Sequence, residues 1–204
     1  MIVQALQQVL SETECSVDSE FIERRTGIGA RSIFKKALEK CGMKHDDTLI
    51  EKLMKRGSLI YNNLVEYEIL FEGTVDLLEE LKGKIRIALA TMSTRRLIEM
   101  SLQRSGLSTY FEVVLSADDV VNPKPDPEIF LKCAEQLQLR SEDCVVIEDS
   151  IFGVKAARKA GIKCIAVATG SYSPEELKSA GADLVVESVN SKEEILDFLF
   201  QRYV

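Results

Sequence analysis

Apolar residues recur every three to four positions through the first third of the chain, which is the spacing of amphipathic helices. Asp46 or Asp47 can cap the last and longest of these segments. No convincing strand pattern occurs before about residue 70, so we predict a small helical domain over residues 1–70. The repeating groups are Ala5, Leu6, Val9 and Leu10; Ile33, Phe34, Ala37 and Leu38; and Leu49, Leu53, Leu59, Ile60 and Leu64.

After residue 71 short apolar runs alternate with helical patterns. This alternation predicts an α/β fold for residues 71–204, with a parallel sheet covered by helices on both faces and functional loops at the carboxyl ends of the strands. The expected strands are 84–91, 111–115, 144–147, 163–168 and 183–186, and the expected helices are 74–81, 93–104, 127–137, 151–160, 174–180 and 191–203.

The composition narrows the function classes. In 204 residues, 46% are hydrophobic and 29% are charged, and the net charge is -7. An acidic balance argues against a nucleic-acid partner, because binding to phosphate backbones requires clustered Lys and Arg. No apolar run is long enough to span a bilayer, and the amino-terminal residues resemble no secretory leader. We therefore expect a soluble cytoplasmic protein with no membrane partner.

Cysteine and histidine supply few candidates for chemistry. The five cysteines are widely spaced and form no Cys-x-x-Cys pair, so we interpret them as reduced, small hydrophobic residues. The single histidine, His45, would have to carry any Ser-His-Asp triad, and no Gly-x-Ser-x-Gly motif is present to supply its nucleophile.

The first candidate for chemistry is the turn after strand 84–91. Thr91 ends that strand, and Ser93 and Thr94 open the next helix. A hydroxyl together with backbone N–H groups at a strand-to-helix turn can hold phosphate oxygens. A purely structural helix cap explains the same residues.

A second candidate is Lys124, which lies between Pro123 and Pro125 ahead of a helix that Asp126 can cap. Two prolines restrict the backbone, so the ammonium group is held more firmly than on an ordinary surface loop. A fixed cation suits a phosphoryl group or an aspartyl nucleophile. The alternative is a solvated surface lysine.

The third candidate is the acid pair Glu148 and Asp149 at the end of strand 144–147. Adjacent carboxylates repel each other unless a cation or hydrogen bonds offset the repulsion. Magnesium prefers carboxylate oxygens and keeps several waters, so one or two carboxylates and a substrate phosphate suffice to bind it. The structural alternative is an acidic helix start capped by Asp149 or Ser150.

In this order along the chain, these motifs resemble the haloacid dehalogenase superfamily, in its phosphatase and phosphoglucomutase-like branch with a helical cap. The resemblance covers nearly the whole chain. It implies a cap domain over residues 1–70 and a Rossmann-like, three-layer core over 71–204. The segments that carry it are ALATMSTRR, NPKPDPEIF, VVIEDSIFGVKAARKAGI and AVATGSYSPEEL.

The resemblance also implies roles for individual residues. Thr91 would hydrogen-bond the phosphoryl group with help from the Met92 backbone N–H, and Ser93 belongs to the same phosphate-binding turn. Lys124 would stabilise negative charge on the nucleophile and the phosphate. Asp149 would bind Mg²⁺ directly, and Glu148 would do so directly or through water. Gly153, and the small residues after it, would let the following helix approach the sheet.

The chain departs from the family pattern at one decisive point. The family begins with a buried strand ending in Asp-x-Asp, whose first aspartate is the nucleophile, and no Asp-x-Asp occurs in these 204 residues. That strand lies in the family between the strands that end here at Thr91 and Ile147, and its omission would leave backbone groups unpaired at a cost of about 1–3 kcal/mol each. We therefore expect an upstream start for the natural protein. A smaller departure is Pro123, where the family usually has Gly.

Several functions remain open at this point. The leading one is hydrolysis of a small phosphorylated metabolite through an aspartyl-phosphate with Mg²⁺, inactive in the chain as written. A phosphosugar mutase and a non-catalytic interaction or phosphate-sensing protein are the alternatives. A dinucleotide-binding site has little support, because GIGARS follows no strand and lacks the third glycine. The loop 26–31 is a candidate substrate contact or a plain interhelical turn.

Overall fold

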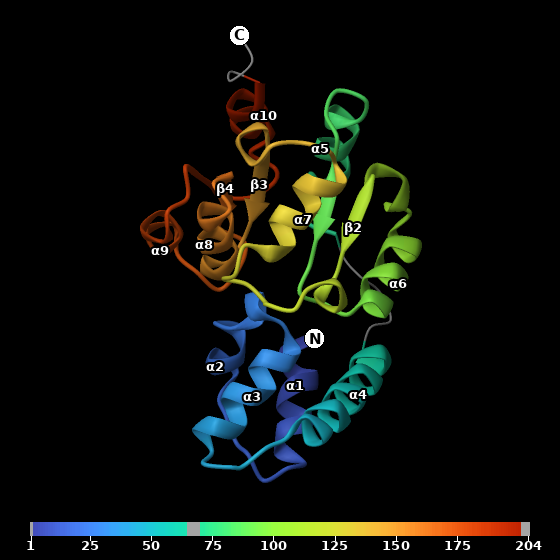
Figure 1. Ribbon diagram of the computed structural model, residues 1–204, viewed down its shortest axis with the longest axis vertical. Coiled ribbons are helices and arrows are strands. Elements are labelled where there is room, and N and C mark those ends of the chain that lie inside the picture. Colours follow the sequence, from blue (N-terminus) through green and yellow to red (C-terminus); the bar gives the residue numbers. More distant parts are fainter. Residues whose placement is uncertain (1, 65–69, 201–204) are drawn as a thin grey trace. The chain divides into compact units, whose positions relative to one another are not determined.

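The structure, a computed structural model, describes residues 2–64 and 70–200 (Figure 1). It separates into two compact units, Met1–Glu68 and Ile69–Val204. We call the first the helical unit and the second the α/β unit.

The helical unit is built from amphipathic helices around α1, which packs against the other three α-helices. The predicted apolar faces supply its core, where Phe34 and Ile50 are completely buried. Asp46 caps α4, because its carboxylate accepts a hydrogen bond of 2.8 Å from the Leu49 N–H. The elements are α1 (Ile2–Ser11), α2 (Ser19–Glu23), the 3₁₀ turn η1 (Thr26–Ile28), α3 (Ala30–Lys40) and α4 (Asp47–Leu64).

Two of the cysteines form a disulfide, so their interpretation as reduced thiols is wrong. Cys15 follows α1 and Cys41 follows α3, and the bond joins them with Cα atoms 5.7 Å apart. The sequence contains no signal for this pairing, because the two residues are 26 positions apart and only the packing of the helices brings them together. Cys133, Cys144 and Cys164 are unbonded, as predicted.

The α/β unit alternates helices and strands as the sequence predicts. Its helices are α5 (Thr74–Leu81), α6 (Arg95–Ser105), α7 (Glu128–Gln136), α8 (Ile151–Lys159), α9 (Pro174–Ala180) and α10 (Lys192–Phe200). Its strands are β1 (Ala88–Ala90), β2 (Val113–Leu115), β3 (Val145–Glu148), β4 (Lys163–Val167) and β5 (Leu184–Val186). The short 3₁₀ turns are η2 (Ser108–Tyr110), η3 (Ala117–Asp119) and η4 (Ser141–Asp143).

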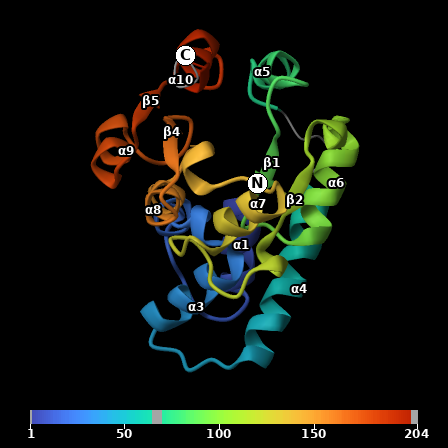
Figure 2. The ribbon, with the colours of Figure 1, turned by 45° about the horizontal axis from the view of Figure 1, so that its top comes forward.

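The five described strands form two separate parallel sheets. β1 pairs with β2, and β3, β4 and β5 form the second sheet in that order. No described strand joins β1 to β3, and Figures 1 and 2 draw the two sets of strands apart. This is the place where the sequence predicts that a strand is missing.

Helices cover both faces of these sheets, so the unit has the three layers expected of the fold. On one face, α7 packs on β1 and β2, α8 packs on β3 and β4, and the two helices contact each other. One apolar cluster runs under them and includes Leu115, Ile129, Val146 and Ala157. The opposite face is divided between two clusters, and α5 contributes to both of them.

The largest difference from the predicted elements is the length of β1, which spans Ala88–Ala90 instead of residues 84–91. Ile87 and Thr91, which flank β1, still form hydrogen bonds with Glu112 and Leu115 on the side of β2. No described strand pairs with the other side of β1. The predicted last helix reaches residue 203, and its final positions lie outside the described residues. Within the described ranges, none of the helices has the length and apolar character that a membrane crossing requires.

Candidate active site

Lys124 is the centre of the candidate site. It is 4% exposed, although Val121 in the same loop is 84% exposed, so the loop turns inward at the lysine. Its ammonium nitrogen lies 3.5 Å from the carbonyl oxygen of Ala90, the last residue of β1, and forms an ion pair with Glu148, the last residue of β3. The ring of Phe130 packs 4.7 Å from the same nitrogen. Lys124 therefore links the carboxyl ends of the two separate sheets.

Glu128 holds the loop that carries Lys124, a role that the sequence did not reveal. Its carboxylate accepts hydrogen bonds from the backbone N–H groups of Val121 and Asn122 and pairs with Lys132 one helical turn later. The bond from Lys132 and those from the two backbone groups lower the pKa of Glu128 to about 2. Asp126 accepts from the Glu128 N–H at 3.0 Å, but the N-cap residue of α7 is Pro127, so Asp126 lies one residue ahead of the cap position that the sequence predicts for it.

The Glu148 carboxylate is fully engaged by protein groups. One oxygen pairs with Lys124, and the other accepts from the N–H of Asp149, the N–H of Ser150 and the Ser150 hydroxyl at 3.1–3.2 Å. Gly153 makes room for it, because a Cβ at that position would lie 2.0 Å from the Glu148 carboxyl carbon. The family resemblance implies that Gly153 lets the helix pack close to the sheet. In the structure it accommodates the carboxylate.

Asp149 is an exposed residue, and its carboxylate interacts with that of Glu148. Loss of solvating water around the carboxylate and the nearby charge of Glu148 raise the pKa of Asp149, and Lys124 opposes them. Gly170 lies against this residue, since a Cβ there would be 2.8 Å from the Asp149 carbonyl oxygen and 3.2 Å from Oδ2. Gly170 belongs to the ATGS segment of the sequence. The only sequence signal for its contact with Asp149 is that glycine has no side chain.

Thr91 occupies the turn that leaves β1. Its N–H donates to the Leu115 carbonyl at 2.9 Å, and its hydroxyl oxygen accepts from the Ser93 N–H at 3.1 Å. Thr94 is the N-cap residue of α6, yet its side chain makes no capping hydrogen bond. Instead Asp118 accepts from the Arg95 N–H at 2.8 Å. The structural alternative of a simple Ser/Thr helix cap therefore does not explain the hydroxyls at Ser93 and Thr94.

A network of charged residues supports this turn from the end of β2. The Asp119 carboxylate accepts from the N–H and hydroxyl of Ser116 and pairs with Arg95. Burial alone would raise the pKa of Asp119, but the bonds from Ser116 and the charge of Arg95 outweigh it and lower the pKa. Asp118 and Asp119, which matched no expected motif, thus position the start of α6.

The predicted site residues lie in a consistent order around Lys124. Thr91 directly follows Ala90, and Asp149 directly follows Glu148, so each lies one residue from a group that Lys124 contacts. Met92 is partly buried and packs against the apolar cluster beneath α7 and α8. Their catalytic and ligand-binding roles stay predictions.

Comparison with known proteins identifies the family. The sequence model described as "Haloacid dehalogenase-like hydrolase" matches residues 1–167. The chain belongs to this family. The match extends through the helical unit and most of the α/β unit, which includes Thr91, Lys124 and Asp149.

Curated relatives of this haloacid dehalogenase-like chain include phosphatases. It is 42% identical to a phosphorylated carbohydrates phosphatase of Thermotoga maritima over 129 residues, which are 62% of this chain and 58% of the relative. It is 39% identical to the fructose-1-phosphate phosphatase YqaB of Escherichia coli over 93 residues, 46% of this chain and 50% of that protein. The chain thus spans about half the length of these relatives.

Solved structures agree with the family over more of the chain. A hydrolase from Pseudomonas syringae matches with a TM-score of 0.89 and 28% identity, covering 97% of this chain and 91% of its own. A β-phosphoglucomutase from Clostridium difficile matches with a TM-score of 0.87 and 26% identity, covering 99% and 90%. The predicted superfamily and its phosphatase and phosphoglucomutase-like branch are confirmed.

The donor set of this haloacid dehalogenase-like site fits Mg²⁺ through one carboxylate. Among the described residues, no group of three or more His, Cys, Asp or Glu side chains gathers to hold a metal. Glu148 is occupied by Lys124 and by the start of α8, whereas Asp149 is an exposed residue with no ion pair to a cation among the described residues. Magnesium keeps several waters and accepts one carboxylate together with a phosphate oxygen. Asp149 would hold the ion, with substrate phosphate completing its ligands.

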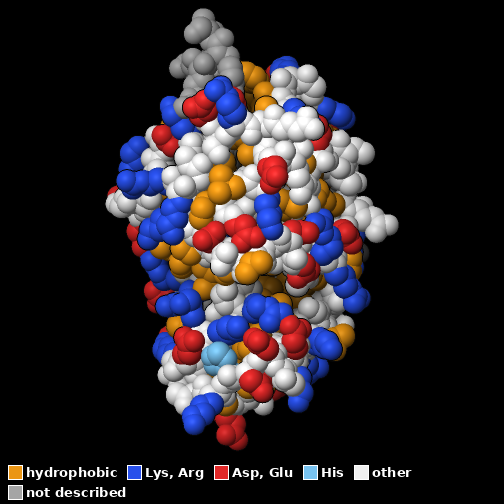
Figure 3. Space-filling view, viewed as in Figure 1, with side chains coloured by type: hydrophobic (Ala, Val, Ile, Leu, Met, Phe, Trp, Pro, Cys, Tyr) orange, Lys and Arg blue, Asp and Glu red, His pale blue; other side chains and the backbone are white. Residues whose placement is uncertain are grey.

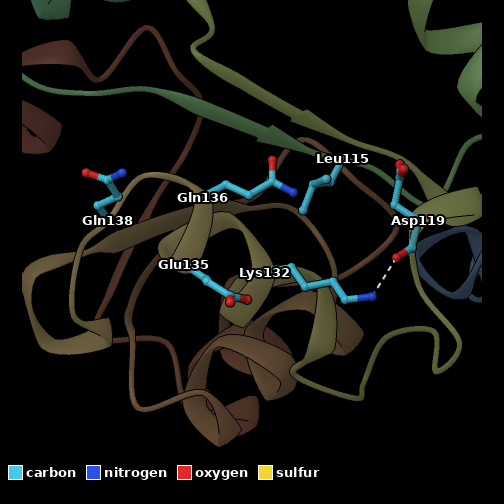
Figure 4. A pocket seen from close by; sticks show the side chains of 6 residues that line it. All are labelled: Leu115, Asp119, Lys132, Glu135, Gln136 and Gln138. Atoms are coloured by element: carbon cyan, nitrogen blue, oxygen red, sulfur yellow. Dashed lines mark hydrogen bonds between the residues drawn. The ribbon is translucent and has the colours of Figure 1, made fainter.

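A separate cavity of about 490 Å³ lies beside α7, away from these residues (Figure 4). The Lys132 ammonium donates to the Asp119 carbonyl oxygen at 2.7 Å at one side of it. None of the predicted site residues lines this cavity, and we assign no chemistry to it. Its lining residues are Leu115, Asp119, Lys132, Glu135, Gln136 and Gln138.

Proposed function

We propose that this chain binds the phosphoryl group of a small phosphorylated metabolite and acts in phosphomonoester hydrolysis. The observation that supports the proposal is the position of Lys124. It is a buried cation at the carboxyl ends of β1 and β3, and the two residues that its ammonium group contacts, Ala90 and Glu148, directly precede Thr91 and Asp149. Open α/β sheets bind their ligands at such strand ends. The phosphatases among the relatives point to the same class of substrate.

Three groups would donate hydrogen bonds to the phosphate, and two carboxylates would support them. Lys124 would donate from its ammonium group to a phosphate oxygen, and the hydroxyl of Thr91 and the N–H of Met92 would donate to others. Asp149 would hold Mg²⁺, which supplies neutralisation of charge on the phosphoryl group. Glu148 would keep Lys124 in place, because it already anchors that ammonium group.

The complete reaction needs an aspartate that the chain does not offer at this site. In the proposed chemistry an aspartate oxygen attacks phosphorus, the P–O ester bond breaks, and the alcohol leaves with a proton from a general acid. Water then attacks the phosphorus of the aspartyl-phosphate and releases phosphate and the aspartate. No Asp-x-Asp segment exists in these residues. We therefore propose that hydrolysis requires an Asp-x-Asp strand in addition to these residues, and that these residues alone bind phosphate without turnover.

A direct binding experiment tests the site. Inorganic phosphate should bind in the presence of Mg²⁺ in a calorimetric titration, and Thr91→Val and Lys124→Met should each weaken binding by about tenfold or more. Lys155→Met, which removes an exposed lysine on α8, is the matched control and should bind as the wild type does. Equal affinity in the Thr91→Val, Lys124→Met and control variants would rule the site out.

An activity experiment tests the missing nucleophile. Release of phosphate from a generic aryl phosphate with Mg²⁺ should stay at background for the chain as written. It should rise when an apolar strand ending in Asp-x-Asp is fused to the amino terminus. Turnover by the unfused chain that Lys124→Met abolishes would show that the nucleophile lies among the present residues.

Two other functions have particular observations in their favour. The match to a β-phosphoglucomutase favours transfer of a phosphoryl group between positions of a sugar. The absence of Asp-x-Asp, together with neutralisation of Lys124 by Glu148, favours a phosphate-sensing protein without catalysis. Phosphate binding with no turnover in the fused protein would support the second of these.

A further inference from the structure

The disulfide of the helical unit joins two residues at equivalent places in the fold. Each lies in the turn that ends a helix, Cys15 after α1 and Cys41 after α3. These two helices contact each other, and Figure 1 draws them together within the unit. The bond therefore ties together the ends of two packed helices, and its reactivity depends on what surrounds each sulfur atom.

The two sulfur atoms differ in how well a solvent molecule can reach them. Cys15 is 1% exposed, and its Sγ lies 3.3 Å from the Ala37 carbonyl oxygen among the packed helices. Cys41 is only partly buried. Gly42 beside it leaves open space, since a Cβ there would meet no described atom within 4 Å other than those of its chain neighbours. Because exchange requires a thiolate to reach a sulfur atom directly, an external thiol can attack at Cys41 and not at Cys15.

The turn that carries Cys15 has an unfavourable backbone conformation. Glu14 has a φ of 60°, in the left-handed region, where a residue with a side chain is strained and glycine is not. The turn closes with a hydrogen bond of 3.2 Å from the Cys15 N–H to the Leu10 carbonyl. At the other end of the bond the left-handed position is occupied by a glycine, Gly42, with a φ of 69°. The disulfide therefore helps to hold a turn that Glu14 opposes.

The core of the helical unit is packed independently of this bond. Its buried side chains come from three helices and include Leu6 of α1, Phe34 of α3 and Ile50 of α4. Helix α1 contacts α2, α3 and α4, so the apolar faces meet around it. Burial of apolar surface is the main force that holds such helices together. Opening of the disulfide should therefore release the turn at Cys15 and leave the helices in place.

The three unbonded cysteines lie in the α/β unit and are poor competitors for the same chemistry. Burial raises the pKa of Cys133 to about 11 and that of Cys164 to about 12. Burial and the charge of Asp143 also raise the pKa of Cys144. The thiolate is the reactive form of cysteine, so these three side chains stay protonated and unreactive near neutral pH.

We propose that Cys15 and Cys41 form a reversible redox site, which a dithiol reductant opens by attack on the sulfur of Cys41. The attacking thiolate forms a mixed disulfide with Cys41, the bond between the two cysteines breaks, and Cys15 leaves as a thiolate that takes up a proton. The second thiol of the reductant then attacks the mixed disulfide, releases Cys41 and completes the reductant's own disulfide. Two electrons and two protons pass to the protein. The proposal does not rest on the proposed phosphatase function.

Reduction of the folded protein is the first test. The whole protein is incubated with dithiothreitol, a small dithiol, in the absence of denaturant. Alkylation of free thiols followed by peptide mass mapping then identifies the reduced cysteines. We expect Cys15 and Cys41 to become reduced while the helical signal in circular dichroism is kept. A disulfide that stays closed until denaturant is added, or helices that unfold when it opens, would overturn the proposal.

Two single variants test the point of attack. Cys15→Ser leaves the Cys41 thiol and Cys41→Ser leaves the Cys15 thiol, so both proteins lack the same bond and each is the matched control of the other. Each variant is mixed with glutathione disulfide, and peptide mass mapping follows the mixed disulfide at the remaining cysteine. Cys41 should react about tenfold faster or more, because its sulfur is the accessible one. Equal rates, or a faster reaction at Cys15, would overturn the proposal.

Amide hydrogen exchange of the wild-type protein measures what the bond holds in place. After reduction, the protection factor of the Cys15 amide should fall by about tenfold or more, because its turn is no longer tied to Cys41. The amides of Leu53 and Ile60 lie within α4 and should keep their protection. Loss of protection throughout α4, or no loss at Cys15, would overturn the proposal.

Glu14→Gly tests the contribution of the strained turn. Glycine adopts a φ of 60° without strain, so in this variant the Cys15 amide should lose protection by only about threefold or less on reduction. Ser16→Gly is the matched control, since Ser16 also neighbours Cys15 and does not have a positive φ. It should lose as much protection at Cys15 as the wild type does. Equal losses in the two glycine variants would overturn the proposal.

Discussion

β4 and β3 are adjacent strands of similar apolar sequence, yet they differ sharply in burial. In β4, Ile165 and Ala166 are completely buried, and strands flank both sides. In β3, Ile147 is 36% exposed, and only the β4 side is paired. The apolar pattern is therefore the same for a strand with two neighbours and for a strand with one, and the neighbours decide how much of the pattern is buried.

Charged groups also differ between the surface of the molecule and the unpaired ends of β1 and β3. Surface charges of both signs are interspersed over the face shown in Figure 3. The buried pair of Lys124 and Glu148, by contrast, lies where β1 and β3 end and their sheets stay unpaired. In place of a continuous ladder, one ion pair connects the two sheets at this end. Variants of β3 and β4 can measure the effect of burial by neighbouring strands, and variants of Lys124 and Glu148 can measure the effect of the ion pair.

Removal of Lys124 should have the largest effect. Lys124→Met leaves the Glu148 carboxylate, whose side chain is 10% exposed, without its cation, so the free energy of unfolding should fall by about 3–5 kcal/mol. Urea unfolding followed by circular dichroism measures the loss. The double variant Lys124→Met, Glu148→Gln should recover most of it. Equal losses in both variants would show that packing of the lysine stem, rather than the charge, stabilises the end of the sheets.

Truncation of one isoleucine in each strand tests the comparison itself. Ile165→Ala removes a completely buried side chain from β4 and should lower the free energy of unfolding by about 2–4 kcal/mol. Ile147→Ala should cost about 1 kcal/mol or less, because the side chain is already partly in water. The same urea titrations measure both. Similar losses would contradict the view that β3 is an open edge.

Gly153→Ala should have a smaller effect than Lys124→Met and Ile165→Ala. The added methyl group would lie 2.0 Å from the Glu148 carboxyl carbon, so the carboxylate or the start of α8 must shift, at a cost of about 1–3 kcal/mol. Gly57→Ala is the matched helical control. There the new Cβ would meet the Phe34 ring at 3.6 Å, an ordinary contact, and should stabilise by up to about 1 kcal/mol. Thermal unfolding of both variants should therefore move in opposite directions.

The sequence predicted the fold well where periodicity and capping determine structure. Thr74–Leu81 and Pro174–Ala180 are helices with the expected bounds, and Asp46 caps α4 as expected. Strand β1 was predicted too long, because the apolar run from Ile85 also serves packing under α5. Periodicity shows which residues are apolar, but it does not show whether a neighbouring strand is present to pair with them.

The candidate site was predicted less completely, for a different physical reason. Strand ends placed Lys124 and Glu148 at one edge of the fold, but their direct pairing depends on side-chain direction, which no local pattern encodes. The contact of Gly153 with Glu148 and that of Gly170 with Asp149 follow from the same tertiary approach. The Cys15–Cys41 bond was missed because helix packing creates it.

The smallest expected effect concerns pH and the loop that carries Lys124. The pKa of Glu128 falls from 4.5 to about 2 in the folded protein, so the unfolded chain takes up this proton more readily. The stabilisation is complete above about pH 4.5 and is lost as the pH falls toward about 2. In this window the protection factors of the Val121 and Asn122 amides, which correct for the intrinsic pH dependence of exchange, should fall, whereas those of β4 amides should not. Glu128→Gln should make the protection factors of both amides independent of pH in this window, and an unchanged profile in that variant would assign the effect to another carboxylate.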